Sequence, residues 1–264
     1  MSEKSRSIIT LLTDFSSSDG YPGIMKGVIL DIDPDAKIID VTHDIPKWDI
    51  RSAAFVLLYA YEYFPRGSIH VCVVDPGVGS DREIIILETP DHLFIAPDNG
   101  LLSLIFEKEE NYKVYIIDPE LDIFGNISNT FHGRDIFAPT AAYLSLGENI
   151  MDFGEIYSEF KTDLIPGPVI NRELITGEIV YVDSFGNLIS NIKRTDIEKF
   201  HKRKNIQIEI SDQKISGLKK SYDSAGKGEI LALISSSDFL EIACCRCSAS
   251  EILSVKIGAK IRLS

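Results

Sequence analysis

The stretch Ser68-Ile-His-Val-Cys-Val-Val-Asp-Pro-Gly-Val-Gly-Ser-Asp-Arg-Glu-Ile-Ile-Ile-Leu87 contains the pattern that decides the fold of this chain. It begins and ends with runs rich in β-branched residues, and each run predicts a buried strand. Between them, Pro76 fixes its own backbone, and two glycines permit conformations that other residues resist. The sequence therefore predicts two strands joined by a tight loop, with Asp75 near its start and Arg82 near its end.

The same loop argues against one common class of binding site. A glycine loop that binds a dinucleotide leads directly into a helix, whose N-terminus faces the phosphates or the cofactor. Here a strand follows the loop, and the chain contains no phosphate-binding P-loop motif. The pattern therefore disfavours dinucleotide binding and methyl transfer.

Strand and helix patterns alternate on both sides of this stretch, through residue 163. Apolar residues at positions 50, 53, 54, 57, 58 and 61 share one helical face, with Asp49 at the N-cap position. Further strands are expected at 8–15, 37–42, 93–96 and 113–117, and further helices at 23–31, from 101, and at 134–146. This alternation predicts an α/β layer with a mostly parallel sheet, in which ligands bind beyond the carboxyl ends of the strands.

The pattern changes after Leu164-Ile-Pro-Gly-Pro168, and residues 164–173 are interpreted as a linker. Short strands separated by turns, without long helices, then predict a small β-barrel or sandwich. The expected strands are 175–182, 206–210, 230–234, 240–245 and 260–263. We therefore expect an α/β domain at 1–163 and a β domain at 174–264.

The net charge and the hydropathy pattern limit the kinds of binding partner that this chain can have. A formal charge of -13 disfavours nucleic acid and anionic membrane surfaces, but is compatible with a cationic small substrate. No stretch approaches the roughly 18 apolar residues of a membrane span, and the first apolar run is too short for a signal peptide. We expect a cytoplasmic protein with reduced thiols. Because neighbouring strand residues point to opposite faces, Cys244, Cys245 and Cys247 are poorly placed to bind one metal ion. We expect them to be small buried apolar residues, with metal binding or redox duty as the minor alternative.

Three polar residues are candidates for catalysis. His132 follows the Pro/Gly loop by about fifty residues, and could join Asp75 and Arg82 in one cleft. A carboxylate, a permanent cation and an imidazole together can activate water. Taken singly, each could instead be a loop ion pair or a solvated histidine.

Other residues are candidates for substrate binding. Asp14 lies at the end of the first strand, where it could accept hydrogen bonds from a ribose or cap the following helix. Trp48, the only tryptophan, could line an apolar pocket or pack against the next helix. Asn187 could contact an adenine edge or simply form a turn with Phe185, and Ser236 lies in a stretch that also fits a hairpin turn.

Taken together and in order, seven short motifs resemble the S-adenosyl-L-methionine (SAM) hydroxide adenosyltransferases, SAM hydrolases related to the fluorinase and chlorinase enzymes. The resemblance covers about residues 8–263. The motifs are Thr13-Asp-Phe15, Tyr21-Pro-Gly-Ile-Met-Lys-Gly27, Asp40-Val-Thr-His43, Val74-Asp-Pro-Gly-Val-Gly79, Ala96-Pro-Asp-Asn-Gly-Leu101, Phe131-His-Gly-Arg-Asp135 and Asp183-Ser-Phe-Gly-Asn187.

The resemblance implies an α/β domain followed by a β-barrel, in a homotrimer whose substrate sites lie between subunits. It implies that Asp75, Arg82 and His132 activate water and that Asp14 holds the ribose hydroxyls. It further implies that Asp183 faces the methionine portion. The adenine side would be contacted by Asn187 and by the strand that contains Ser236, Glu241 and Cys244.

The implied reaction is hydrolysis of SAM to adenosine and L-methionine, with SAM as substrate and without metal or cofactor. The alternatives are a halogenase on the same scaffold and a non-catalytic SAM or adenosine sensor. The chain departs from the family pattern at Ser16, where glycine is common, and at Cys244-Cys-Arg-Cys247, which replaces a Val-Asn-x-Gly stretch. The second departure bears on the adenine contacts more than on the chemistry.

Overall fold

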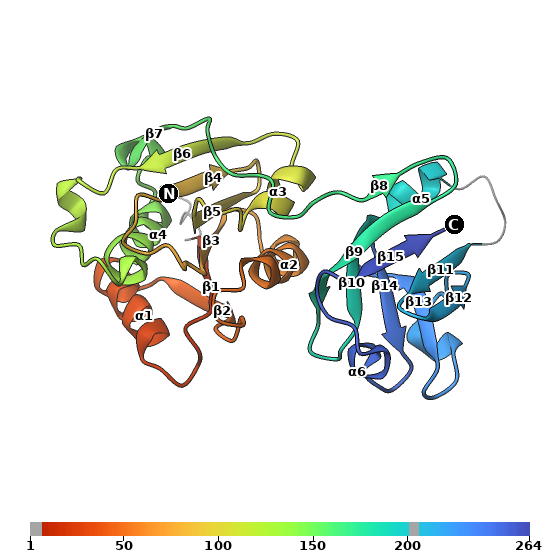
Figure 1. Cartoon of the computed structure of the whole chain (residues 1–264). Coiled ribbons are helices and arrows are strands. Elements are labelled where there is room, and N and C mark those ends of the chain that lie inside the picture. Colours follow the sequence, from red (N-terminus) through yellow and green to blue (C-terminus); the bar gives the residue numbers. More distant parts are fainter. Residues whose placement is uncertain (1–6, 201–205) are drawn as a thin grey trace. The chain divides into compact units, whose positions relative to one another are not determined.

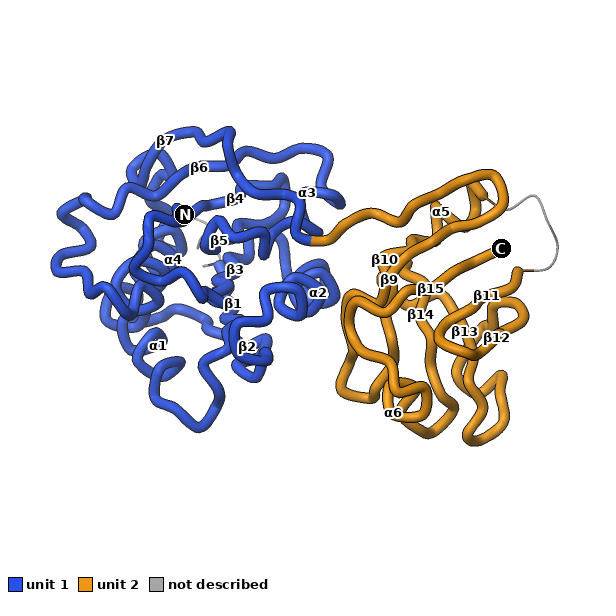
Figure 2. The backbone as a smooth tube through the Cα atoms, viewed as in Figure 1, with its two compact units in different colours: residues 1–164 blue, residues 165–264 orange. Residues whose placement is uncertain are grey.

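The computed structural model describes residues 7–200 and 206–264. The chain divides into two compact units, residues 1–164 and 165–264 (Figure 2). Each unit buries a hydrophobic core of its own. Among the described residues, no helix combines the length and the apolar character needed to cross a membrane.

Unit 1 is built around a seven-stranded sheet with the order β2-β1-β3-β5-β4-β6-β7 (Figure 1). Its strands are β1 (Ile8–Thr13), β2 (Lys37–Thr42), β3 (Ser68–Val73), β4 (Ile84–Glu88), β5 (His92–Pro97), β6 (Lys113–Ile117) and β7 (Gly154–Ile156). The pairs β1–β2, β1–β3 and β3–β5 are parallel, whereas β4 is antiparallel to both β5 and β6. Five strands therefore share one direction, and the predicted α/β class with a mostly parallel sheet is confirmed.

The helices of unit 1 cover both faces of this sheet. They are α1 (Tyr21–Ile32), α2 (Ile50–Ala60), α3 (Ser103–Lys108) and α4 (Ala138–Leu146), the last continuing a π-helical turn (Gly133–Phe137). α1 packs against α4, and α2 packs against α3 (Figure 1). Asp49 caps α2 as predicted, because its carboxylate accepts hydrogen bonds from Ser52 N at 3.0 Å and Ser52 Oγ at 2.6 Å.

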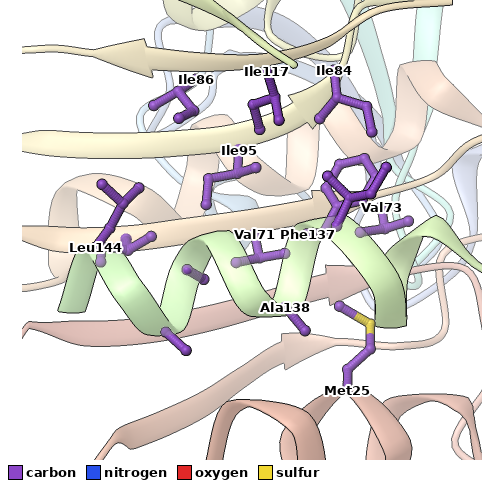
Figure 3. Close-up of a cluster of buried hydrophobic side chains, with 14 of the residues drawn as sticks. Met25, Val71, Val73, Ile84, Ile86, Ile95, Ile117, Phe137, Ala138 and Leu144 are labelled. Carbon is purple, nitrogen blue, oxygen red and sulfur yellow. The ribbon is translucent and has the colours of Figure 1, made fainter. Parts of the chain in front are cut away.

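The larger core of unit 1 lies between α4 and the sheet. Figure 3 shows Phe137 and Leu144 facing the isoleucines and valines of the strands, with Met25 of α1 beside them. Along β1, Ile9 and Leu11 join this core, whereas Thr10 points to the other face and bonds to buried His70. The central strands β1 and β3 are buried along almost their whole length, because side chains on both of their faces pack against other parts of unit 1.

Unit 2 is an antiparallel sheet with the order β12-β11-β15-β9-β10-β14-β13, with β8 paired to β9. Its strands are β8 (Val169–Ile170), β9 (Ile175–Val182), β10 (Leu188–Lys193), β11 (Gln207–Ile210), β12 (Gln213–Ser216), β13 (Ile230–Ile234), β14 (Phe239–Cys244) and β15 (Lys260–Leu263), with the short helices α5 (Arg194–Phe200) and α6 (Ala249–Leu253). Just beyond β12, Lys219 N donates to Ala232 O of β13 at 2.8 Å, so the two ends of the sheet meet. The predicted barrel-like domain is confirmed.

Candidate active site

The structure brings Asp75, Arg82 and His132 into direct contact. Arg82 Nε donates to both oxygens of Asp75 at 3.0 and 2.9 Å, and Arg82 Nη2 lies 2.5 Å from Asp75 Oδ2. The same Nη2 lies 2.8 Å from His132 Nδ1. The Asp75 and Arg82 side chains are only 5% and 8% exposed, so their attraction is weakly screened by water.

The Pro/Gly loop holds Asp75 in place through its own backbone. Asp75 Oδ1 accepts from Gly77 N at 3.2 Å, and Asn99 Nδ2 donates to Val74 O at 2.9 Å. Gly79 has φ +79°, and a Cβ there would collide with the carbonyl oxygen of Asn129. Only glycine therefore allows the loop to lie this close to the segment that leads into His132.

The contact with Arg82 fixes the protonation of His132. A guanidinium can only donate, so Nδ1 must be an acceptor and the neutral imidazole carries its proton on Nε2. Burial lowers the pKa of His132, and the neighbouring Arg82 charge lowers it further, against the opposing effect of Asp75. The chain turns into the π-helical segment immediately after His132. This combination makes His132 a neutral hydrogen-bonding group at neutral pH.

A cavity of about 410 Å³ opens beside these residues in unit 1. Asp75 and His132 line it, together with the predicted binding residues Asp14 and Trp48. Trp48 N donates to Asp14 Oδ2 at 2.8 Å, and the indole is 70% exposed at the cavity. Asp14 does not cap α1, because the N-cap of that helix is Gly20. Trp48 is among the lining residues of the cavity, whose wall also carries the charged side chains of Asp14 and Asp75.

The strand end that carries Asp14 is supported by a polar chain that the sequence did not reveal. Thr13 Oγ1 lies 2.9 Å from His43 Nδ1, His43 Nε2 lies 3.0 Å from Asp40 Oδ1, and Lys26 donates to Asp40 at 2.6 Å. Ser16 has φ 66°, a conformation that glycine adopts readily, which accounts for the glycine that is common at this position in the family pattern.

The same cavity has further lining residues that the sequence did not single out. These include two charged and two aromatic side chains: Asp19, Lys47, Tyr21 and Phe131. Phe15, Tyr21 and Phe131 form a cluster with ring centroids 5.1–5.8 Å apart. A signal for them was present, because Asp19, Tyr21 and Phe131 lie within or beside the quoted motifs. Asp98, which directly follows β5, is turned to other use and accepts a hydrogen bond from Lys161 N at 2.8 Å.

A second cavity, of about 550 Å³, lies in unit 2. Its lining contains four predicted binding residues, namely Asp183, Phe185, Asn187 and Cys244. The Asp183 carboxylate accepts from Phe185 N, Asn187 N and Asn187 Nδ2, each at 2.9 Å, and so shapes the loop from within. Phe185 is 77% exposed.

The two other predicted residues of unit 2 lie apart from this lining. Glu241 is buried in β14 and accepts from Tyr222 OH at 2.9 Å, and Tyr222 is the residue that reaches the cavity. Burial raises the pKa of Glu241, with nearby Asp183 adding to the effect and the Tyr222 bond opposing it. Ser236 lies exposed in the turn between β13 and β14, and the structure does not bring it to the cavity.

The cysteines require a correction. Cys244 and Cys247 form a disulfide, whereas the sequence led us to expect reduced thiols, and only Cys72 and Cys245 are free among the described residues. The expectation of reduced thiols rested on the cytoplasmic interpretation, and the argument from side-chain alternation assumed a strand that continues past Cys244, whereas β14 ends there. Arg246 then takes φ 61°, which turns the chain back so that the Cα atoms of Cys244 and Cys247 lie 5.1 Å apart. Their C-x-x-C spacing was the signal for this pairing.

Across residues 7–200 and 206–264, no group of three or more His, Cys, Asp or Glu side chains is arranged to hold a metal ion.

Two family models match the chain. The model of the SAM hydroxide adenosyltransferase N-terminal domain matches residues 9–154, and the model of the C-terminal domain matches residues 177–262. The chain belongs to the SAM hydroxide adenosyltransferase family.

Other members of this family and more distant relatives align with almost the whole chain. A protein of Methanocaldococcus jannaschii named (R)-S-adenosyl-L-methionine hydrolase is 39% identical, over 94% of this chain and 92% of that protein. A fluorinase of Nocardia brasiliensis is 24% identical, over 98% of this chain and 97% of its own length. The crystal structure of an uncharacterized conserved protein from Thermotoga maritima superimposes with a TM-score of 0.87 at 35% identity, covering 97% of this chain and 99% of that one.

Proposed function

We propose that this enzyme hydrolyses SAM by attack of water on the 5′ carbon of the ribose, giving adenosine and L-methionine. The observation that carries the proposal is the contact of Asp75, Arg82 and His132 at the wall of the unit 1 cavity. Family membership supports it, because several relatives that are 31–39% identical are named (R)-S-adenosyl-L-methionine hydrolase.

The difficult part of this reaction is activation of the nucleophile, because the leaving group needs no assistance. An O–C5′ bond forms as the C5′–S bond breaks, and sulfur leaves as a neutral thioether that needs no acid. Water must lose a proton as it attacks. The positive charge of Arg82 stabilises hydroxide character, and fixed alignment opposite the breaking bond lowers the barrier further. The reaction takes SAM as substrate and needs no metal or cofactor step.

Each member of the cluster has a distinct role in this mechanism. Asp75 orients Arg82 through its paired hydrogen bonds and, as the carboxylate of the cluster that lines the cavity, accepts the proton of water. Arg82 holds His132 in one tautomer. The Nε2–H of His132 can then donate to the water oxygen and fix its position.

The remaining predicted residues bind the substrate. Asp14 holds the ribose hydroxyls, because its Oδ1 has no partner among the described residues while Oδ2 accepts from Trp48 N. Asn187 contacts the adenine through its carbonyl oxygen, since its amide nitrogen already donates to Asp183. We further propose a cytoplasmic homotrimer in which each site takes these residues from two subunits. The division of the predicted contacts between two separately folded units supports this arrangement.

The test is hydrolysis of SAM in water enriched in ¹⁸O, without added metal, followed by mass spectrometry. Both sulfonium epimers should be supplied separately, because the relatives are named for the (R) form. We expect L-methionine and adenosine with the label at the 5′ oxygen. Homocysteine or methylthioadenosine would contradict the mechanism. A 5′-halogenated adenosine in chloride or fluoride would favour the halogenase, and binding without products would favour a sensor.

A further inference from the structure

The disulfide between Cys244 and Cys247 faces the cavity of unit 2. Both cysteines line that cavity, together with Arg246, which lies between them in the sequence. Cys244 is 4% exposed, whereas Cys247 is only half-buried, so an incoming group reaches the sulfur of Cys247 first. Arg246 also lines this cavity, and its exposed guanidinium lies 3.7 Å from the exposed Asp223 carboxylate. Its positive charge at the same wall favours the thiolate form of a nearby thiol.

The turn that the disulfide closes also supports the Asp183–Asn187 loop. Gly186 has φ +81°, and a Cβ there would collide with Ser248, the residue directly after Cys247. Ser250 N donates to Gly186 O at 2.9 Å, which ties the start of α6 to the same loop. The covalent link between β14 and Cys247 therefore anchors the backbone against which this loop packs.

We propose that Cys244 and Cys247 are a reversible dithiol–disulfide site, reduced by a thiol that enters the unit 2 cavity, and that its redox state sets the affinity of that cavity for the nucleoside portion of the substrate. The thiolate of the reductant attacks Cys247 Sγ, the S–S bond breaks, and Cys244 leaves as a thiolate that takes a proton from water. A second thiol then attacks the mixed disulfide. Two thiols are thereby oxidised to one disulfide, and the protein gains two electrons and two protons.

Reduction of the disulfide should weaken substrate binding but leave turnover nearly unchanged. Opening the disulfide frees the turn, so the Asp183–Asn187 loop must be ordered again when the nucleoside binds. Ordering of one or two side chains corresponds to roughly a three- to tenfold loss of affinity. Asp75, Arg82 and His132 lie in unit 1, so kcat should change little. This kinetic part rests on the proposed SAM hydrolysis, whereas the redox chemistry itself does not.

The redox site is tested first without any substrate. The full-length protein is equilibrated with ratios of reduced to oxidised dithiothreitol, alkylated, and analysed by mass spectrometry. We expect Cys244 and Cys247 to exchange together between bridged and doubly alkylated forms under native conditions. The matched control Cys72→Ala removes a buried thiol of unit 1 and should leave this exchange intact. Two permanently alkylated thiols, or a bridge that opens only in denaturant, would overturn the proposal.

Affinity is then measured by calorimetric titration of adenosine into the oxidised and the reduced wild-type protein. We expect the dissociation constant, and the KM for SAM, to rise three- to tenfold on reduction with kcat nearly unchanged. Cys247→Ser should show the reduced-state affinity in both buffers, while Cys72→Ala should respond like wild type. Equal affinities of the two redox forms would refute the inference. If SAM is not hydrolysed while adenosine affinity still follows the redox state, the proposed function fails and the redox site stands.

Discussion

Replacing Asp75 by asparagine separates the chemistry of the cluster from its role in folding. The substitution keeps the size of the side chain and one oxygen that can accept from Arg82, but it removes the negative charge. The Asp75 and Arg82 side chains are 5% and 8% exposed, so the guanidinium loses its counter-ion in a largely dry environment. Breaking a buried ion pair costs about 3–5 kcal/mol of unfolding free energy. The asparagine still accepts one hydrogen bond from Arg82, so the loss of stability should not exceed this range.

The effect on turnover should be larger than the effect on substrate binding. The proposed action of Asp75 is on the water molecule, whose activation matters in the transition state rather than the ground state. Loss of general-base assistance lowers kcat by about 10²–10⁴, which corresponds to about 3–5 kcal/mol of transition-state stabilisation. The KM for SAM should stay within about threefold of wild type. Steady-state hydrolysis and urea unfolding, measured on the same preparations, give the two quantities.

Asp33→Asn is the matched control for Asp75→Asn. Asp33 is another buried carboxylate of unit 1, which accepts from Ser145 Oγ at 2.9 Å and is not part of the cavity lining. This variant should lose stability yet keep kcat. If Asp75→Asn is folded at the assay temperature and retains kcat within about fivefold of wild type, Asp75 does not activate water and the loop is only structural.

Three further results are expected. Asp14→Ala should raise the KM for SAM about 10- to 150-fold with a smaller change in kcat, because charge-assisted hydrogen bonds are worth about 1.5–3 kcal/mol; equal losses in both constants would argue against ribose binding. Burial lowers the pKa of His70 to about 3 from an ordinary value of 6.5, so the unfolded chain binds more protons below pH 6.5. The contribution of neutral, buried His70 to the free energy of unfolding should therefore be fully present above pH 6.5 and fall by about 2 kcal/mol by pH 5. Equal urea midpoints at pH 7.5 and pH 5 would contradict this expectation. Gly79→Ala should lower both stability and kcat, because its Cβ meets the Asn129 carbonyl. Gly67→Ala is the control, since Gly67 has φ +83° and a Cβ there meets only Ser7 Oγ at 4.0 Å, so it should lose about 1–2 kcal/mol of stability and no activity.

The parts of this molecule that were predictable follow from local patterns. Continuous runs of β-branched apolar residues locate the buried strands of unit 1, and the Pro/Gly loop places Asp75 and Arg82 close together because only a short turn separates them. The direction of β4 was not accessible in this way, since hydrophobic alternation is the same for parallel and antiparallel neighbours. The contact of Tyr222 with Glu241 was also out of reach, because the two residues are far apart in the sequence and share no pattern.

The cysteine pair shows a different limit of sequence reasoning. The side-chain alternation of a strand places Cys244 and Cys247 on opposite faces, but only if the strand continues past Cys244. It ends there because Arg246 adopts a left-handed conformation, and nothing in an arginine side chain favours φ > 0. The pairing therefore depended on a single backbone angle that residue type does not indicate, although the C-x-x-C spacing was visible throughout.

The charges around the unit 1 cavity bear on which nucleophile the site selects. Among the residues that the structure describes, Asp14, Asp19 and Asp75 line the cavity against one lysine, Lys47, and Arg82 is already paired with Asp75. A halide would enter this negative environment as an anion, and one unbalanced charge at about 4 Å is worth roughly 4 kcal/mol near a protein surface. Water enters without that penalty, while the sulfonium of SAM is attracted by the same carboxylates. The net charge of the lining thus favours hydrolysis over halogenation, and it does so independently of which residue takes the proton.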